Sequence, residues 1–242
     1  MDEKAMEGFL RSAASAYTPR YTRFLDPAEA SELKRAANAR DLRATFWGGY
    51  PEAERCMAAV GGECAPEQET FPLRVLESPY NARFASITHR DVLGAYMALG
   101  LTRDCIGDII IGNETVYLCT VEAMSDFISE SLQSAGRVSL SFRKARDLNR
   151  IPPPEGVYFR GTVASLRLDA VLAEGFRISR TEAAERIRAG HVKLNHLPVM
   201  QTDAQVSEGA MLSLSGHGRV SLRSIDGLTK KQRIGLTFFR YQ

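Results

Sequence analysis

The sequence lacks several features that define common classes of protein. Its four cysteines form no Cys-x-x-Cys pair, so we expect reduced, partly buried thiols and no zinc or other metal site. No stretch approaches the roughly 18 apolar residues of a membrane span. Met1-Asp2-Glu3-Lys4 leads into no apolar run. We therefore expect a cytoplasmic protein with no secretory signal and no membrane association.

The motifs of nucleotide-dependent catalysis are also missing. His89-Arg90-Asp91 is similar to the catalytic triplet of kinases, but Tyr96 stands where that motif has asparagine, and no Asp-Phe-Gly or glycine-rich loop accompanies it. We interpret the triplet as a helix N-terminus. The segment 216–219 is too short and wrongly placed for a phosphate-cradling loop. The sequence therefore predicts no cofactor and no small-molecule substrate.

Length and proline positions predict an α+β protein of three units. With 242 residues, 44% hydrophobic and 25% charged, the chain has the composition of globular proteins and room for one large domain or two to three small ones. Proline-marked breaks fall at 65–72 and at Ile151-Pro152-Pro153-Pro154, and the second cannot be helical. We expect an N-terminal, mainly helical unit over 1–70, a middle unit over 71–150 and a C-terminal unit over 157–242.

The first unit shows a clear helix start at Asp26-Pro27, where an N-cap residue precedes proline. We expect a strand over 44–47, a short helix over 52–60, and Phe46 and Trp47 in the core.

The middle unit follows the order strand, helix, strand, strand, helix, strand. Gly112-Asn113 between two apolar runs is a strong hairpin signal. This order predicts a ferredoxin-like α+β fold, which RNA recognition motifs share. Only Tyr117 lies on an expected central strand, and no aromatic RNA-binding signature is present, so we expect weak RNA contact at most. The expected strands span 73–76, 84–87, 109–111, 116–118 and 138–142, and the expected helices 89–99 and 124–132.

The C-terminal unit contains two short helices and several strands. Leu168, Val171 and Leu172 share one side of a helix that opens near Arg167. Ser179 and Glu182 have the spacing of a capping box at the start of the second helix. Strands are expected over 157–163, 191–195 and 211–215, with a turn at Asn195-His196 and a final strand that pairs back onto 219–225.

Charge is distributed unevenly along the chain. Residues 164–242 hold 12 Lys and Arg against 7 Asp and Glu, a net charge of +5. The net charge of the whole chain is +2, so residues 1–163 carry a net charge of −3. A basic C-terminal third is expected of a domain that meets nucleic acid phosphates. Because helix N-termini favour anions, Ser179 and Arg180 at the start of the second helix predict a phosphate-binding site.

The C-terminal unit resembles the S4 RNA-binding domain. The matching elements are Arg167-Leu-Asp169, Ser179-Arg180, Gly190-His-Val-Lys-Leu-Asn195, Gly209 and Gly218-Arg219, in the expected order. Two positions depart from that pattern: His196 stands where the family usually has glycine, and Ala210 where an acid commonly follows Gly209.

Across nearly its whole length the chain resembles the YlmH family of bacterial proteins. The marks are Phe24-Leu-Asp-Pro27, Gly48-Gly-Tyr-Pro-Glu-Ala-Glu-Arg55, His89-Arg-Asp-Val-Leu-Gly94, Gly100-Leu-Thr-Arg103, Ile106-Gly-Asp-Ile109 and Ser165-Leu-Arg-Leu-Asp169. The resemblance implies an RNA-binding factor of ribosome-associated quality control. It implies binding to a large ribosomal subunit obstructed by peptidyl-tRNA, with rRNA or tRNA as the contacted partner.

We expect binding without catalysis, because guanidinium groups suit phosphate geometry and backbone contacts position a protein without reading sequence. The predicted RNA-binding residues are Arg167, Arg177, Ser179, Arg180, Arg186, Arg188, Lys193, Asn195, Arg219, Lys230 and Lys231.

Two alternatives remain open. One is a protein-interaction adaptor linked to cell division. The other is an RNA-modifying enzyme that carries an S4 domain and uses Asp91, Asp104 or Asp108. A pseudouridine synthase is not favoured, because the only Arg-Leu-Asp triplet, residues 167–169, lies inside the S4-like helix. Signatures of a tyrosyl-tRNA synthetase or an RNA methyltransferase are absent from the sequence.

Overall fold

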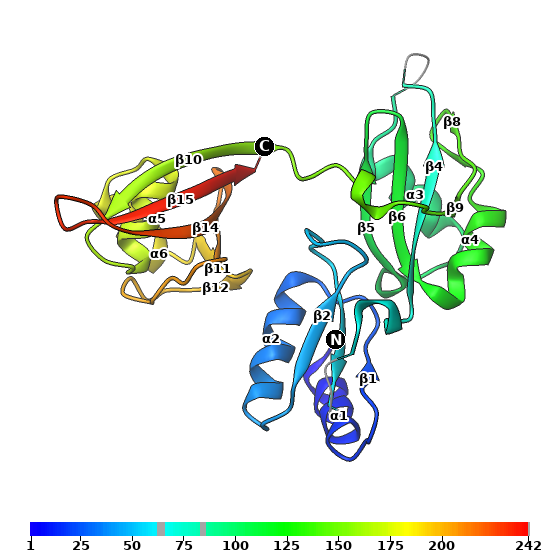
Figure 1. The fold of residues 1–242 in the computed structure, drawn as a ribbon, viewed down its shortest axis with the longest axis horizontal. Coiled ribbons are helices and arrows are strands. Elements are labelled where there is room, and N and C mark those ends of the chain that lie inside the picture. Colours follow the sequence, from blue (N-terminus) through cyan, green and yellow to red (C-terminus); the bar gives the residue numbers. More distant parts are fainter. Residues whose placement is uncertain (62–65, 83–85, 242) are drawn as a thin grey trace. The chain divides into compact units, whose positions relative to one another are not determined.

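The computed structural model describes residues 1–61, 66–82 and 86–241 (Figure 1). The chain divides into two compact units, Met1–Pro153 and Pro154–Gln242. Each unit has its own buried apolar side chains. No helix in the described ranges combines the length and apolar character needed to cross a bilayer.

The N-terminal part of the first unit packs two helices against a small sheet. Its elements are α1 (Glu3–Ala14), β1 (Arg20–Tyr21), α2 (Pro27–Asn38), β2 (Ala44–Trp47) and β3 (Met57–Val60). The antiparallel sheet has the order β1-β3-β2. The predicted start of α2 is confirmed: the Asp26 side chain caps the helix and accepts from the amides of Ala28 and Glu29, and the Asp26 amide donates to the Glu29 carboxylate. The strand predicted over 44–47 is confirmed as β2.

The helix predicted over 52–60 is wrong. Residues 57–60 form β3, the central strand of the sheet. Its residues Met57 to Val60 are all buried, so the strand shows no alternation between apolar and polar positions. A short continuous apolar run has the same appearance in a buried helix and in a buried strand.

The middle part of the first unit forms a four-stranded antiparallel sheet of order β5-β6-β4-β9. Figure 1 shows its long strands side by side with α3 and α4 nearby. Its elements are β4 (Leu73–Pro79), α3 (His89–Ala98), β5 (Ile106–Ile111), β6 (Thr115–Val121), α4 (Ser125–Ser131), β7 (Ser134–Ala135), β8 (Val138–Ser139) and β9 (Arg143–Lys144). Both predicted helices and the hairpin at Gly112-Asn113 are confirmed.

The closing strand predicted over 138–142 is wrong. Residues 138–139 pair instead with β7, and β9 supplies the strand beside β4. Val138, Leu140 and Phe142 are buried while the residues between them are exposed. The alternation therefore arises because one side of the segment is buried, and not because the whole segment pairs as a strand. Residues 84 and 85 of the strand expected over 84–87 lie outside the described ranges, and Ser86 and Ile87 belong to no strand.

The two parts of the first unit share a buried cluster. Phe24 and Met57 pack in it with Leu73, Tyr117 and Cys119 of the middle sheet. The junction is also polar, because the carboxylate of Asp108 accepts hydrogen bonds from the Tyr50 hydroxyl at 2.9 Å and from the amides of residues 54 and 55. Burial, followed by the nearby Asp108, raises the pKa of Tyr50 far above its usual range.

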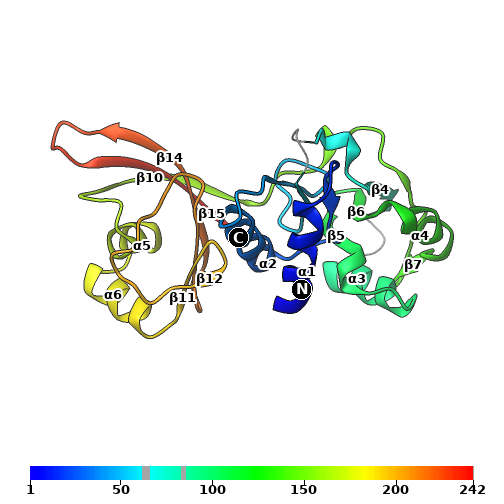
Figure 2. The same cartoon turned by 90° about the horizontal axis from the view of Figure 1, so that it is seen from below.

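The second unit is a six-stranded antiparallel sheet with two helices on one face. Figure 2 shows α5 and α6 together on one side of the curved sheet. The sheet order is β10-β15-β14-β13-β11-β12. The elements are β10 (Gly156–Val163), α5 (Leu168–Phe176), α6 (Arg180–Arg188), β11 (Val192–Leu194), β12 (Leu197–Pro198), β13 (Met211–Leu214), β14 (Gly218–Leu228) and β15 (Ile234–Tyr241).

The core of this unit lies between the helices and the sheet. Leu168, Val171 and Leu172 of α5 are fully buried, as the predicted apolar stripe requires. They pack with sheet residues such as Val220 and Phe238. The predicted return strand is confirmed, because β15 pairs along β14 from Val220 onward. The turn at Asn195-His196 is also confirmed: both residues have positive φ, 49° and 68°.

Candidate nucleic-acid interface

The start of α6 is held by Ser179. Its hydroxyl accepts a hydrogen bond from the Glu182 amide at 3.1 Å, which satisfies one of the helix's unpaired donors. The second half of the predicted capping box is not formed. The Glu182 carboxylate instead lies 3.5 Å from Nη2 of Arg186, one turn further on. The helix start is therefore fixed by the serine alone.

Asp169 joins the two helices through arginine. Arg167 reaches its carboxylate with Nε and Nη2, each at 3.3 Å, and Arg180 reaches it with Nη2 at 3.0 Å. The Asp169 side chain is 8% exposed, while those of Arg167 and Arg180 are 37% and 56% exposed. A buried carboxylate thus fixes two outward-lying guanidinium groups at one place.

The electrostatics of this cluster follow from its geometry. Burial raises the pKa of Asp169, but hydrogen bonds from Arg167 and Arg180 outweigh burial and hold that pKa below its ordinary value. The hydrogen bond between Arg167 and Asp169 raises the pKa of Arg167, although desolvation of the guanidinium opposes this shift. A guanidinium carries five N–H donors, so Arg180, which uses only Nη2 here, keeps Nε and Nη1 for an external anion.

The other predicted arginines on these helices differ in how many side-chain partners they have. Arg177 ends α5 with a φ of 59°, pairs with Glu174 at 2.9 Å, and stacks on the Phe159 ring. Arg186 pairs with Glu182. Arg188 is exposed and has no ion-pair or hydrogen-bond partner within the described ranges. Both pairings have spacings that bring side chains together on a helix, three residues for Glu174 and Arg177 and four for Glu182 and Arg186.

The remaining predicted residues lie away from the helices. Lys193 is on β11, and Arg219 is on β14, where it covers the Tyr241 ring at 5.0 Å. Lys230 and Lys231 are exposed in the turn between β14 and β15. The side-chain oxygen of Asn195 accepts a hydrogen bond from the Met211 amide at 2.9 Å. The structure therefore brings Arg167, Ser179 and Arg180 together, and distributes the others over the sheet and a hairpin.

The net positive charge of the second unit is also divided between its helices and its strands. Residues 167–188 carry five arginines against four carboxylates, a net of +1, whereas residues 189–242 carry seven Lys and Arg against three carboxylates, a net of +4. Most of the positive charge that the sequence predicted for this unit therefore belongs to its strands and connections. A segment-by-segment count would have found this without coordinates.

The carboxylates of the enzyme alternative all have structural partners. Asp91 caps α3 in a capping box with Thr88, as the predicted helix start requires. Asp104 pairs with Arg23, and Asp108 holds residues 50–55. Asp169 is committed to two arginines. In the described part of the chain, no group of three or more His, Cys, Asp and Glu is placed to hold a metal ion.

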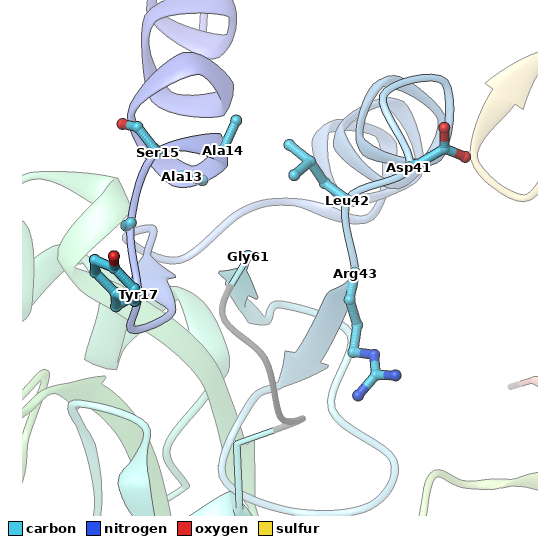
Figure 3. Close-up of a pocket in the computed structure, with 9 residues that line it drawn as sticks. Ala13, Ala14, Ser15, Tyr17, Asp41, Leu42, Arg43 and Gly61 are labelled. Carbon is cyan, nitrogen blue, oxygen red and sulfur yellow. The ribbon is translucent and has the colours of Figure 1, made fainter.

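Two hollows lie in the first unit. One, about 580 Å³, lies between the end of α1 and residues 41–43, with Tyr17 and Arg43 on opposite sides of Gly61 (Figure 3). Its serine, Ser15, donates to the carbonyl of Ser12 and so caps α1. The other, about 610 Å³, is lined by Arg23, Arg55 and Arg103 among others. Arg55 donates there to the carbonyls of residues 24, 103 and 106, which makes it a structural support.

The helix pair, the sheet behind it and the Asp169 cluster define a protein with a C-terminal S4-type domain. The family model of the S4 domain matches residues 166–212. Two further models match upstream: "YlmH, N-terminal" over residues 4–63, and "Putative RNA-binding domain in YlmH" over residues 66–148. The chain belongs to the YlmH family.

Two comparisons with individual proteins agree with this assignment. The chain is 38% identical over 241 residues to the "Ribosome-associated protein quality control protein P2" of Bacillus subtilis (strain 168), covering 98% of this chain and 93% of that protein. The solved structure of the "Cell division protein ylmH from Streptococcus pneumoniae" matches with a TM-score of 0.54 and 22% identity. It covers 62% of this chain and 92% of that chain, and supports the fold alone.

Proposed function

We propose that this protein binds RNA through its C-terminal unit and acts on the bacterial large ribosomal subunit. In this account it contacts rRNA or tRNA during quality control of stalled peptidyl-tRNA complexes, in the cytoplasm, without making or breaking covalent bonds. The name of the Bacillus subtilis relative supports the ribosomal setting. The proposed RNA-contacting residues are Arg167, Arg177, Ser179, Arg180, Arg186, Arg188, Lys193, Asn195, Arg219, Lys230 and Lys231.

The observation that carries this proposal is the Asp169 cluster. The buried carboxylate fixes Arg167 and Arg180 in place before any ligand arrives, and both guanidinium groups remain partly exposed. Preorganisation of this kind reduces the entropy that binding would otherwise cost. The N-terminal amides of α6 and the Arg180 side chain then lie at the same helix end, where a phosphate is favoured.

The internal ion pairs are compatible with this role. Arg177 and Arg186 pair with carboxylates at the surface, and such exposed pairs stabilise a protein by only about 0 to 1 kcal/mol. A phosphate that offers bidentate, charge-assisted hydrogen bonds competes well with them. Arg188 has no ion pair to break among the residues that the structure describes. We therefore rank Arg188 and Arg180 as the first contacts, with Arg186 next.

For the middle of the chain we propose a ferredoxin-like unit over 71–150, between an N-terminal unit over 1–70 and the S4 domain over 157–242. The strand order β5-β6-β4-β9, with α3 and α4 as the connections, supports that assignment. Tyr117, the one aromatic residue of a central strand, is only 5% exposed, which argues against base stacking on this sheet. This unit is accordingly a platform that contacts RNA weakly at most.

The absence of catalysis is also part of the proposal. Every carboxylate considered for an enzymatic role has a structural partner, and Asp169 faces two arginines inside the fold. Its arginine partners hold the pKa of Asp169 below the ordinary value, so Asp169 lacks a general acid's proton at neutral pH.

The test is co-sedimentation of the full chain with large ribosomal subunits, comparing Arg188→Glu with Arg35→Glu. Both arginines lie in the last turn of a helix, on α6 and α2, so both changes alter net charge and helix-end electrostatics equally. We expect only Arg188→Glu to weaken binding, roughly 10- to 100-fold, because a charged hydrogen bond is lost and a repulsion is gained. Equal binding by both variants would favour the adaptor alternative, in which the first unit carries the contact.

Crosslinking identifies the RNA itself. Ultraviolet crosslinking of the full chain to ribosomes, followed by sequencing of the bound RNA, should recover rRNA or tRNA fragments with the parent and few with Arg180→Glu/Arg188→Glu. Recovery of the same fragments at the same yield with the double variant would remove α5 and α6 from the account.

A further inference from the structure

The six-stranded sheet of the second unit has a second face, opposite α5 and α6. Val220 and Phe238 are fully buried beneath the helices. Because side chains alternate along a strand, the neighbouring Arg219 and Phe239 belong to the other face. Tyr158 lies directly opposite Phe239 in the β10–β15 ladder and shares that face. We call this side of the sheet the outer face.

Aromatic rings and arginines form a continuous group on the outer face. The ring centroids of Tyr158 and Phe239 are 4.8 Å apart, and those of Phe239 and Tyr241 are 4.9 Å apart. Arg223 lies over the Phe239 ring at 5.1 Å, and Arg219 lies over the Tyr241 ring at 5.0 Å. We call these five residues the outer-face cluster. Cation–π attraction of this kind favours a guanidinium group over the face of a ring.

One ring of the cluster is open to an external partner. Tyr158 is 63% exposed, whereas Phe239, which lies between Tyr158 and Arg223, is only 4% exposed. A large aromatic side chain exposed on a sheet leaves apolar area in water that neighbouring residues do not cover. An edge of the row of rings is therefore available for stacking by a planar group.

The charge of the outer face is positive. The ladder places Lys193 opposite Ser213, and Ser213 opposite Arg219, so both cations lie on this face with the cluster. Arg160 follows Tyr158 by two residues on β10 and shares its side of the strand. Hydrogen bonds from Ser224 and Thr237, and then the charge of Arg160, lower the pKa of Asp226. The residues named on this face therefore include four cations, Lys193, Arg219, Arg223 and Arg160, and one carboxylate, Asp226.

We propose that the outer face is a second nucleic-acid site, which takes single-stranded RNA. An unpaired base stacks on Tyr158, and the backbone phosphates meet Arg160, Arg219, Arg223 and Lys193. Open sheet faces that combine stacking rings with cations bind single strands without a sequence preference. The proposal extends the RNA binding proposed above to another face, and does not depend on α5 or α6.

Two observations favour a single strand over other anionic partners. An acidic peptide would satisfy the cations but would leave the exposed Tyr158 ring without a planar partner. A duplex would offer phosphates but would keep its bases stacked inside. The exposed Tyr158 and the partly buried Tyr241 also lie outside residues 166–212, the segment that the S4 family model matches, so these two rings are an addition to that segment.

The test is titration of the full chain with a short fluorescein-labelled oligouridine at low ionic strength. Tyr158→Ala should weaken binding roughly 5- to 100-fold, the effect of losing one base–aromatic stack, while Tyr158→Phe retains the parent affinity. Val157→Ala is the matched control, because Val157 is also exposed, at 55%, but lies on the other side of the strand. Melting temperatures establish that all three variants fold. Parent-like binding by Tyr158→Ala overturns the proposal.

Two further comparisons separate this site from the helix surface. Arg188→Glu and Arg35→Glu should bind oligouridine equally, although only the first loses affinity for the large ribosomal subunit. A labelled oligoglutamate of the same length should bind more weakly than oligouridine and should not discriminate Tyr158→Ala from the parent. Equal or tighter binding of oligoglutamate would identify the face as a site for acidic peptides and overturn the RNA assignment.

Discussion

Arg180 and Asp169 are joined across two helices: Nη2 of Arg180 lies 3.0 Å from Oδ2 of a carboxylate that is 8% exposed. Arg167 completes the arrangement from the start of α5. A buried carboxylate with two guanidinium partners both ties α5 to α6 and fixes the direction of the arginines. Structure and proposed binding therefore depend on the same side chain.

Replacing Asp169 by asparagine should destabilise the second unit by about 1 to 3 kcal/mol, because charged hydrogen bonds are lost and two arginines face an uncharged group. Chemical denaturation of the full chain, followed with a probe in the second unit, measures the change. Glu174→Gln, which removes an exposed partner of Arg177, should cost at most about 1 kcal/mol. Equal losses in the two variants would contradict a special role for Asp169.

The same carboxylate predicts a pH dependence. Its folded-state pKa is lowered, so its contribution to stability is complete above the unfolded value of about 4 and disappears as pH falls through the folded value. The melting temperature of the second unit should therefore fall between neutral pH and about pH 3. Asp169→Asn should show a smaller fall. A parallel fall in parent and variant would assign the acid sensitivity to other carboxylates such as Asp226.

Asn195 separates a structural role from an RNA-binding role. It adopts a φ of 49° and accepts from the Met211 amide, so Asn195→Ala should destabilise the unit by about 1 to 3 kcal/mol through strain and a lost hydrogen bond. Asn195→Gly removes the strain and should be milder. If Asn195→Gly loses RNA affinity without loss of stability, the side chain contacts RNA directly; if affinity follows stability in both variants, the residue only shapes the turn.

The junction within the first unit depends on Gly107. A Cβ atom there would lie 2.5 Å from Cε1 of Phe24 and 2.9 Å from Cβ of Cys119, so Gly107→Ala should cost about 1 to 3 kcal/mol. Gly94→Ala is the control, since a Cβ atom on this helical glycine meets nothing within 4 Å. That change should stabilise the unit by about 0.5 to 1 kcal/mol. Differential scanning calorimetry distinguishes the opposite signs.

Local signals in the sequence predicted much of the fold. Asp26-Pro27 located a helix start because capping and proline geometry act within one turn, and Gly112-Asn113 located a hairpin for a similar reason. The errors arose where burial, rather than local chemistry, decides. Met57 to Val60 are buried on both sides and carry no period, so the strand was taken for a helix.

The candidate site shows the same division. The arginines of α5 and α6 could be named from the sequence, as could the helix start at Ser179. The partner of Arg180 could not, because Asp169 lies on the other helix and only the packing of α5 against α6 brings the two side chains together. Of the outer-face cluster, only Arg219 was named from the sequence, and the rest was missed for a different reason. Tyr158, Arg219 and Phe239 come from three strands far apart in the chain, and only the ladder register brings them to one face.

The salt dependence of binding to the large ribosomal subunit shows whether α5 and α6 contact RNA phosphates. If α5 and α6 contact RNA through about five phosphates, the logarithm of the affinity should fall against the logarithm of the salt concentration with a slope of roughly −3 to −4, because each phosphate contact contributes ~0.7 to the slope. Arg188→Glu should reduce the magnitude of that slope by about 1, and Arg35→Glu should leave it unchanged. A flat response in the parent, or the same slope in all three proteins, would contradict the account.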